Sequence, residues 1–438
     1  MPSELVRQIL DGDVTFFEGS TALTATGWLR HPERYFDEWL DDIDQRRPRR
    51  YARTLLLGMG GSSSPARLYA DWRHEATLSV IDTSNPDTIA GLDFREATVI
   101  ASSKSGGTVE TQTLLAHALA SGLDPDDLVI ITDPGTALAE LGESLGALVV
   151  LGDPHTGGRF SSLSPFGLVP ALYAGWTPAE LREELASCFL TDDLVARAVH
   201  DAAELSTHVV DGAGFFALGA DPITSGGALW LEQLVAETTG KSDRGFIPII
   251  QGPVSLYRPG DMQYFHLVAA LLAWHLGVDP FNQPNVESAK KEVFALLNST
   301  VAWEPAPHDG AELLQALTSA SYIAVQAYAP LDASGRLAAL RVDIEEEFGV
   351  STANLGPRYL HSTGQLHKGG PTSVVGLQII QRPRTPPQRI SGRHYSFHDL
   401  HMAQAIGDYR AMRAAGRGAF QLMVDDVSEI GEILRLTS

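Results

Sequence analysis

Short apolar runs alternate with helix-length segments between Thr54 and Leu151, and this alternation limits the folds open to the chain. The runs are TLLL, TLSVI, TVIAS, DLVIIT and ALVVL, and segments such as Thr108–Ala120 and Thr136–Leu145 lie between them. Strands that are apolar along their whole length are typical of parallel sheets with helices on both faces. Residues 51–200 are therefore predicted to form a doubly wound α/β domain.

A second α/β half is predicted over residues 201–381. The segment GFFALGADPITSGGALWLEQL, which begins at Gly214, has the same order of strand, Gly/Ser turn and helix as TLLLGMGGSSSPARLYADW. Residues 1–50 are predicted to be a helical N-terminal segment, and residues 382–438 a C-terminal segment of helix and strand. The expected fold class is α/β, with two doubly wound parallel-sheet halves and helical segments at the two ends.

Charge and cysteine content exclude several classes of protein. The chain has 32 Lys and Arg against 54 Asp and Glu, so its net charge of −22 repels nucleic acid and anionic membranes. Cys188 is the single cysteine, which rules out an internal disulfide. The first residues, MPSELVRQILDGDV, do not resemble a secretory signal, and no apolar run approaches about 18 residues. We expect a cytoplasmic protein. An anionic ligand would need a local cluster of positive side chains or backbone N–H donors to bind to it.

The first candidate ligand loop follows the apolar run TLLL. It runs from Gly58 to Ser64 and contains Gly60, Gly61 and Ser62. Glycines let a backbone approach a ligand closely, and free N–H groups and hydroxyls can hold a phosphate. Ser63 stands where a dinucleotide fingerprint has its third glycine, and the loop has no P-loop lysine. A nicotinamide cofactor is therefore not expected; a plain strand–helix turn is the structural alternative.

A second loop, SSKSGGT, follows the run TVIAS and precedes a predicted helix. Thr108 stands where it can cap that helix. Two such loops at the carboxyl ends of strands in one sheet strengthen the prediction of a phosphate site. A third loop, from Gly157 to Ser164, places Arg159 behind two glycines, where a guanidinium can pair with an anion.

These three loops resemble those of the sugar isomerase (SIS) family, and within it the glucose-6-phosphate isomerases. GMGGS, SKSGGT and GGRFS are similar to the family patterns GIGGS, SKTFTT and GGRYS, in the same order. The departure is Gly106-Gly107, where the family has Phe-Thr. The resemblance implies a substrate phosphate held by these residues: Ser62, Ser103, Lys104, Ser105 and Thr108. It also implies that these glycines lie in the substrate loops: Gly60, Gly61 and Gly158.

Two further blocks extend the resemblance to Lys291. The segment ending ETTGK is similar to the family's ESNGK, which implies that Glu237 is the catalytic base. The segment QPNVESAK is similar to DQWGVELGK, which implies that Lys290 helps to open the sugar ring. The family's histidine motif NGQHAFYQ has no counterpart before this lysine, so His367, His361 or no histidine fills that role. The stretch GPRYLHSTGQLHKGGP resembles the isomerase half of fused transaldolase–isomerase proteins.

The resemblance implies an aldose–ketose isomerase that interconverts glucose 6-phosphate and fructose 6-phosphate through an enediolate. In this hypothesis Glu237 moves the proton, Arg159 stabilises the enediolate, and Lys290 with His367 opens the ring. The reaction needs no cofactor and no metal, the partner is a small sugar phosphate, and a homodimer is expected from the family. Two alternatives stay open: an isomerase of another sugar phosphate, such as a mannose or aminosugar phosphate, and a non-catalytic phosphosugar sensor.

Overall fold

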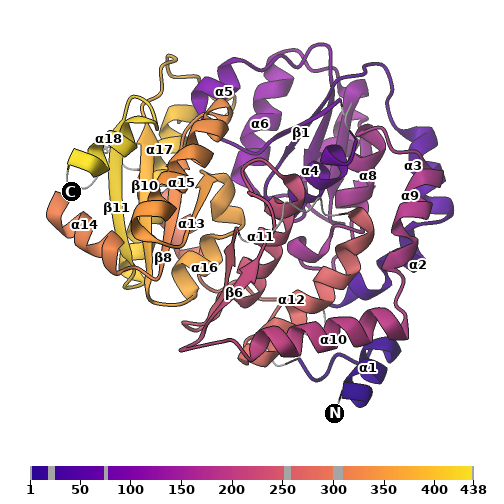
Figure 1. The fold of residues 1–438 in the computed structure, drawn as a ribbon. Coiled ribbons are helices and arrows are strands. Elements are labelled where there is room, and N and C mark those ends of the chain that lie inside the picture. The colour runs from indigo at the N-terminus through magenta and orange to yellow at the C-terminus, as the bar shows by residue number, and fades with distance from the viewer. Residues whose placement is uncertain (1, 18–24, 74–76, 251–257, 299–308, 437–438) are drawn as a thin grey trace.

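The first parallel sheet is built from the predicted apolar runs. The computed structural model describes residues 2–17, 25–73, 77–250, 258–298 and 309–436. In it the strand order is β2-β1-β3-β4-β5, with every neighbouring pair parallel (Figure 1). The strands are β1 (Thr54–Gly58), β2 (Leu78–Ile81), β3 (Thr98–Ser102), β4 (Leu128–Thr132) and β5 (Leu148–Leu151).

Helices cover both faces of this sheet because its strands are apolar on both sides. Successive strand side chains point to opposite faces. Leu56 accordingly packs in one core, while Leu55 and Leu57 pack in another. The first core includes side chains of α4 (Ser64–Asp71) and α8 (Pro165–Tyr173), and the second those of α5 (Pro86–Ala90), α6 (Val109–Ala120) and α7 (Ala137–Leu145).

A helical layer and a two-stranded sheet connect the halves. The strands β6 (Ala213–Ala217) and β7 (Gly245–Ile249) pair in parallel. Every residue of α11 (Gly226–Thr239) is buried, and this helix runs between the two larger sheets (Figure 1). The other helices of this layer and of the N-terminal segment are α1 (Pro2–Asp11), α2 (His31–Tyr35), α3 (Glu38–Arg46), α9 (Pro178–Glu184), α10 (Asp192–Ser206) and α12 (Met262–Leu276).

The second large sheet is also parallel throughout. Its strand order is β11-β10-β8-β9. The strands are β8 (Tyr322–Tyr328), β9 (Ser351–Leu355), β10 (Val374–Gln381) and β11 (Gly418–Val424). The helices of this half are α13 (Val286–Leu297), α14 (Gly310–Ser319), α15 (Ser334–Phe348), α16 (Gly364–Gly369), α17 (Phe397–Ala414) and α18 (Glu429–Leu436).

Helices again cover both faces. Leu337 of α15 and Ile430 of α18 share a core with Leu377 and Ile379 of β10. On the other face Ala405 of α17 packs with residues of β8 and β10. The α/β prediction with doubly wound parallel sheets is therefore confirmed. The expected boundary at residue 381 falls directly after β10, whereas β11 belongs to the same sheet, so this sheet continues into the expected C-terminal segment.

The two large sheets share a strand order. The sequence β9-β8-β10-β11 of the second sheet corresponds to β2-β1-β3-β4 of the first. In each, the chain leaves the first strand for a neighbour on one side and then crosses to the other side. Such a reversal leaves a crevice outside the carboxyl ends of the two central strands, and ligands of open α/β sheets bind there. The first sheet has this switch point between β1 and β3, the second between β8 and β10.

Candidate active site

The first sheet's switch point is lined by the loops that follow β1 and β3. After β1 the chain turns through the 3-10 helix η3 (Gly60–Ser62), which packs against a second one, η5 (Gly158–Phe160). A Cβ atom on Gly61 would lie 2.0 Å from the Gly158 carbonyl oxygen, so only glycine allows this approach. Gly60 has φ +54°, and a Cβ there would lie 2.5 Å from the His361 carbonyl oxygen. The glycines thus let three loops meet.

The hydroxyl groups of the predicted phosphate loops lie close to one another. The Lys104 amide donates to Ser62 Oγ at 3.3 Å, which ties the β3 loop to the β1 loop. Ser103 Oγ donates to Thr108 Oγ1 at 2.9 Å, and the Gly107 amide donates to Ser105 Oγ at 3.2 Å. Thr108 occupies the N-cap position of α6, but its hydroxyl pairs with Ser103. The expected side-chain cap is therefore wrong, and this hydroxyl belongs to the loop.

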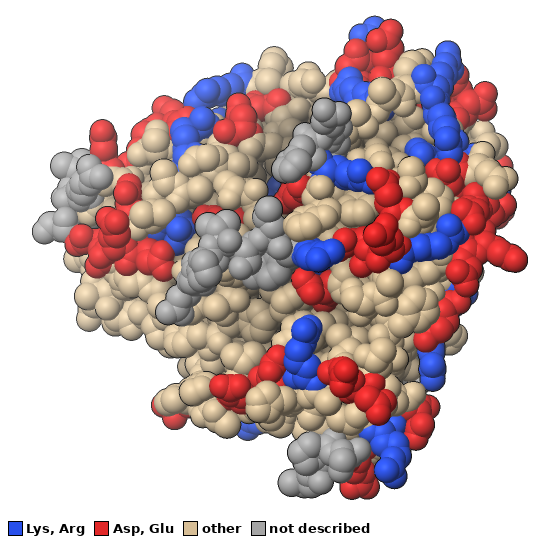
Figure 2. All heavy atoms as spheres, turned by 45° about the vertical axis from the view of Figure 1, so that its right-hand side comes forward, with Lys and Arg blue, Asp and Glu red and all other residues tan. Residues whose placement is uncertain are grey.

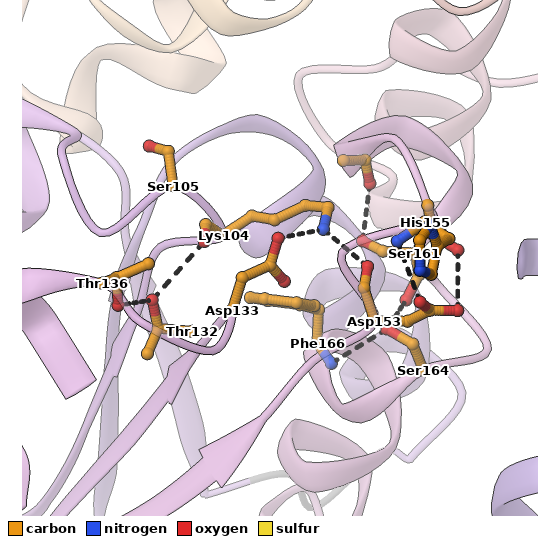
Figure 3. A network of polar contacts seen from close by, with 12 residues as sticks. Lys104, Ser105, Thr132, Asp133, Thr136, Asp153, His155, Ser161, Ser164 and Phe166 are labelled. Carbon is orange, nitrogen blue, oxygen red and sulfur yellow. Dashed lines mark hydrogen bonds and ion pairs between the residues drawn. The ribbon is translucent and has the colours of Figure 1, made fainter. Parts of the chain in front are cut away.

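Lys104 directs its ammonium group away from these hydroxyls. It forms an ion pair with Asp133 and donates to the Asp153 carbonyl oxygen at 2.7 Å. Figure 3 shows the side chain running toward Asp133, while Ser105 points away from that ammonium. Burial raises the pKa of Asp133, and the Lys104 charge opposes that rise. The lysine thus links the ends of β3, β4 and β5, while its backbone N–H donates to Ser62 Oγ.

Glu237 and Arg159 form a buried ion pair beside these loops. Arg159 Nη1 lies 3.3 Å from Glu237 Oε2, and the two side chains are 2% and 5% exposed. The Nη2 atom of Arg159 also donates to the carbonyl oxygens of Pro280 at 2.8 Å and Asn282 at 3.0 Å. Burial raises the pKa of Glu237, and the arginine charge offsets that rise only in part. A carboxylate with a raised pKa is a stronger base than an ordinary glutamate and is better suited to take up a proton.

Gln233 lies one helical turn before Glu237 on α11 and binds its carboxylate. Its Nε2 donates to Glu237 Oε2 at 3.3 Å and to the His361 carbonyl oxygen at 3.0 Å. Its Oε1 accepts from Ser64 Oγ at 2.7 Å, which fixes the orientation of the amide. Gln233 thereby connects the carboxylate to the first helical turn after β1.

His361 lies at the end of the 3-10 helix η9 (Arg358–His361), close to the same carboxylate. Its Nε2 is 2.9 Å from Oε1 of Glu110, which is buried in the first turn of α6. Burial opposes the charged form of His361, but the Glu110 carboxylate raises its pKa above the ordinary histidine value, against the opposing charge of Lys290. His361 is 25% exposed, so a ring whose pKa is raised stays accessible.

His367 lies in a different environment. Its Nδ1 is 2.9 Å from Gln326 Nε2 of β8, and its ring packs near Tyr322 and Tyr359. Its Nε2 is buried and has no hydrogen-bond partner among the described residues. Burial, together with the charge of Lys368, lowers the pKa of His367 to about 3. This histidine is a neutral core group beneath the second sheet.

Lys290, the predicted ring-opening lysine, is an exposed residue of α13. Its charge acts on the pKa of His361, so the two groups lie within electrostatic range of each other. The structure therefore brings Arg159 and His361, which come from different halves, to the carboxylate of Glu237, and Lys290 acts on His361. It keeps His367 apart from that carboxylate.

Three supporting residues were missed by the sequence reasoning: Glu110, Gln233 and Asp133. Glu110 follows Thr108 by two residues, and an acid in the first helical turn usually means only a favourable helix dipole. Gln233 precedes Glu237 by four residues, a spacing that places both on one helix face. That spacing was the available signal for Gln233. The contact of Asp133 with Lys104 depends on the pairing of β3 with β4.

Surface charge and candidate metal ligands add little to this site. On the face that Figure 2 shows, basic side chains lie among acidic ones. Within the described ranges, one group could offer three metal-ligand atoms, namely His200, Asp201 and Glu204 of α10, and exposed acidic groups commonly gather without an ion. Of the helices in the described part of the chain, none is long and apolar enough to cross a membrane.

Comparison with known proteins relates part of the chain to sugar-phosphate enzymes. No family model matches it. A glucose-6-phosphate isomerase of Campylobacter jejuni is 28% identical over 231 residues, 48% of this chain and 55% of the relative. One of Thermus thermophilus is 31% identical over 247 residues, 50% of this chain and 56% of the relative. The crystal structure of a glucose-6-phosphate isomerase from Chlamydia trachomatis has a TM-score of 0.47 at 15% identity, covering 64% of this chain and 75% of that one. The chain spans about half the length of the curated relatives it matches.

Proposed function

We propose that this protein is an aldose–ketose isomerase of sugar phosphates. The observation that carries the proposal is the buried pair of Glu237 and Arg159 beside hydroxyl-bearing loops at the switch point of the first sheet. A single base that works between adjacent carbons needs a carboxylate with a raised pKa and a fixed positive group. The similarity to glucose-6-phosphate isomerases points to glucose 6-phosphate and fructose 6-phosphate as the substrate pair.

Glu237 is the proton carrier in this proposal. It removes the proton from C2 of the open-chain aldose and returns it to C1, while a second proton passes from the C2 hydroxyl to the C1 oxygen. The intermediate is an enediolate, whose negative charge is stabilised by the Arg159 guanidinium. Gln233 keeps the carboxylate in place through its 3.3 Å hydrogen bond. Because the site is buried, the arginine charge acts through a low dielectric and is worth more than it would be in water.

Ring opening is assigned to His361, with Lys290 nearby. Opening a pyranose requires a group that gives a proton to the ring oxygen, and a histidine whose pKa is raised by Glu110 can do so. The contacts of His361 support it over His367, whose pKa of about 3 leaves it neutral. Lys290 is a second positive group within electrostatic range of His361.

The phosphate is held by hydroxyls and backbone donors. The hydroxyl groups come from the loops that follow β1 and β3, and α6 begins directly after the second of these loops. They belong to Ser62, Ser103, Ser105 and Thr108. Unpaired N–H groups at the start of such a helix favour an anion. The Lys104 ammonium is engaged with Asp133, so its part in this proposal is to fix the loop. Binding energy from the phosphate positions C1 and C2 against Glu237.

Two finer expectations belong to the same proposal. A homodimer and a kinship with the isomerase half of fused transaldolase–isomerase proteins both rest on family resemblance, and both stay predictions. Another hexose phosphate as the substrate is the alternative within the same chemistry. The present contacts of Glu237 and His361 fit any aldose–ketose pair with a terminal phosphate.

Turnover in D2O tests the proposal directly. The protein is incubated with fructose 6-phosphate in D2O, and the sugar is followed by proton NMR, with mannose 6-phosphate and glucosamine 6-phosphate as parallel substrates. We expect glucose 6-phosphate to form with deuterium at C2, because a carboxylate base exchanges its proton with solvent. If only mannose 6-phosphate or glucosamine 6-phosphate were turned over, that sugar would be the substrate of the proposed isomerase. Binding without any exchange would mean a sensor and would overturn the proposed function.

A further inference from the structure

A polar cavity lies at the carboxyl ends of the strands of the second sheet. Its volume is about 490 Å³. Pro330, Asp332 and Arg336 line it from the segment that follows β8. Gln381 and Arg384 line it from the end of β10 and the segment beyond. This volume is in the range of small-molecule sites in proteins, which runs from about 300 to 1,000 Å³.

The topology makes this position equivalent to the site in the first half. The segment after β8 leads into α15 on one face of the sheet, and the segment after β10 leads toward α17 on the other. The cavity is therefore the crevice at the switch point between β8 and β10, as the hydroxyl loops mark the switch point between β1 and β3. Open α/β sheets bind ligands at such points, so the position itself favours a ligand.

Two arginines supply the positive charge of this cavity. Arg336 Nε lies 3.2 Å from Asp426 Oδ1, and Arg384 Nη2 lies 3.5 Å from Asp426 Oδ2. Their side chains are 41% and 66% exposed. A guanidinium carries five N–H donors, and these contacts occupy only some of them. The two guanidinium groups, brought together by one carboxylate, present the paired donors that phosphoryl groups prefer.

The carboxylates of the cavity disfavour an anion that has no hydroxyl groups, because they would repel its charge. Asp332 and Asp426 both line it, and carboxylate oxygens accept hydrogen bonds from hydroxyl groups. Asp426 Oδ1 already accepts from Ser428 and Arg336, so Asp426 offers a ligand its Oδ2. A third acid, Asp87, is already occupied, because it accepts the amides of Arg384 and Thr385 and the Thr385 hydroxyl. A ligand with one phosphoryl group and several hydroxyls satisfies both the arginines and the remaining acceptor capacity of these carboxylates.

The cavity also bridges the two halves of the molecule. Asp87 and Thr88 belong to α5 of the first half, and Thr88 Oγ1 accepts the Leu331 amide at 3.0 Å. Asp87 binds the segment after β10. A ligand in this cavity would therefore contact both halves at once.

We propose that this cavity is a second binding site for a phosphorylated sugar or polyol, with the phosphoryl group on Arg336 and Arg384 and the hydroxyls on Asp332 and Asp426. The site is separate from the carboxylate of Glu237 and takes no part in the isomerisation. Its occupant is a phosphate ester with several hydroxyl groups, and inorganic phosphate alone is a poor substitute.

Calorimetric titration of the full chain with glucitol 6-phosphate tests this proposal, since that polyol phosphate has no carbonyl and cannot isomerise. We expect two equivalents to bind to the unaltered protein. The variant Arg336→Gln/Arg384→Gln should lose one of them, with affinity at that site at least tenfold weaker. Its isomerase kcat and KM should stay unchanged. Ser103→Ala/Thr108→Val should weaken the other equivalent.

Arg382→Gln is the matched control. Arg382 is exposed, pairs with Asp425 and does not line the cavity, so its removal should leave both equivalents in place. Thermal unfolding of each variant checks the fold. If the double variant does not fold, the single variant Arg384→Gln gives the same comparison, because that side chain is largely exposed.

Three results would overturn the proposal. The first is an arginine variant that titrates like the unaltered protein. The second is inorganic phosphate binding to the arginine site as tightly as glucitol 6-phosphate, which would leave the carboxylates without a role. The third is unphosphorylated glucitol binding equally well. Failure of the proposed isomerase would show separately, as one equivalent that depends on the arginines and none that depends on Ser103.

Discussion

The two parallel sheets have the same order in four strands but end in loops of opposite character. After β1 and β3 the chain has GMGGSSS and SKSGGT, which are rich in glycine and serine. After β8 and β10 it has prolines at positions 330, 383, 386 and 387. The ion pair of Arg159 and Glu237 at the first switch point is buried, whereas the arginines at the second are partly exposed.

This difference teaches how backbone chemistry decides the kind of site that one topology carries. Glycine permits loops to approach within van der Waals contact and leaves N–H groups available. Proline has no N–H and fixes φ, so a proline-rich loop offers fewer backbone donors. The Arg384 and Thr385 amides already bind the Asp87 carboxylate, so the positive charges of the second switch point come from the side chains of Arg336 and Arg384.

Removing the proton carrier is the largest expected effect. Glu237→Gln should lower kcat by about 10³-fold with little change in KM, because the amide keeps the shape but cannot take up the proton. Glu232→Gln is the control on the same helix, since Glu232 is buried against Asn354 at 3.0 Å and lies five residues earlier, on another face. Steady-state kinetics on both variants measures this. Equal losses would mean that any buried acid of α11 matters, and the special status of Glu237 would be lost.

Crowding the glycine contact should cost the next largest amount. Gly61→Ala places a Cβ 2.0 Å from the Gly158 carbonyl oxygen and should destabilise the fold by about 3 kcal/mol. Gly335, in the helix that follows β8, has open space around its Cβ and serves as the comparison. Gly335→Ala should stabilise the fold by about 0.5 kcal/mol. Urea unfolding of the two variants gives the difference. Similar stabilities would mean that the loops do not need this approach.

Removing one hydroxyl of the phosphate loop should have a smaller effect. Ser103→Ala should raise KM about tenfold, since hydrogen bonds to charged groups contribute about 1.5–3 kcal/mol and Ser103 also orients Thr108. Ser102→Ala is the neighbouring control, because the Ser102 hydroxyl is buried and has no hydrogen-bond partner within the described residues. Measuring KM for the Ser103→Ala and Ser102→Ala variants tests this prediction. A tenfold change for Ser102 as well would contradict the assignment of the loop.

The smallest expected effect is a shift of the pH at which kcat falls on the acid side of its pH profile. Burial raises the pKa of Glu237, so the base becomes protonated, and kcat falls, at a higher pH than the ordinary glutamate value of about 4.3. At the second switch point burial opposes ionisation of Asp426, but Ser428 and the two arginines hold its pKa below the ordinary value. Asp426→Asn should therefore leave the kcat profile unchanged. An acid limb at or below about pH 4.3 would argue against Glu237 as the base.

Much of the fold could be predicted because local patterns specify it. The runs TLLL, TVIAS and DLVIIT became β1, β3 and β4, and Thr108–Ala120 became α6 with one residue of difference. The pairing of β11 with β10 was not visible, since neither strand carries a mark of its partner. Strand order depends on how helices cross the sheet, and hydrophobic periodicity does not encode that.

The candidate site, like the fold, has some features that the sequence indicated and others that only the folded chain shows. Loop composition indicated a phosphate site, and the family resemblance implied that Glu237 is the base. The structure puts Arg159 and Glu237, 78 residues apart in the chain, 3.3 Å from each other. A lysine in a serine loop suggests a phosphate ligand, and that role of Lys104 stays a prediction. Only the folded chain brings Asp133 and the Asp153 carbonyl to its ammonium.

The sequence by itself determined the α/β class, the positions of the glycine and serine loops, and the residue types available for acid–base chemistry, because these depend on neighbours along the chain. The tertiary structure alone decided which histidine stands beside the carboxylate. His361 and His367 are six residues apart, yet one pairs with Glu110 and the other is buried against Gln326. It also decided that the second sheet has a polar cavity at its switch point. The pKa and the accessibility of a group depend on the atoms packed around it, and those atoms come from distant parts of the chain.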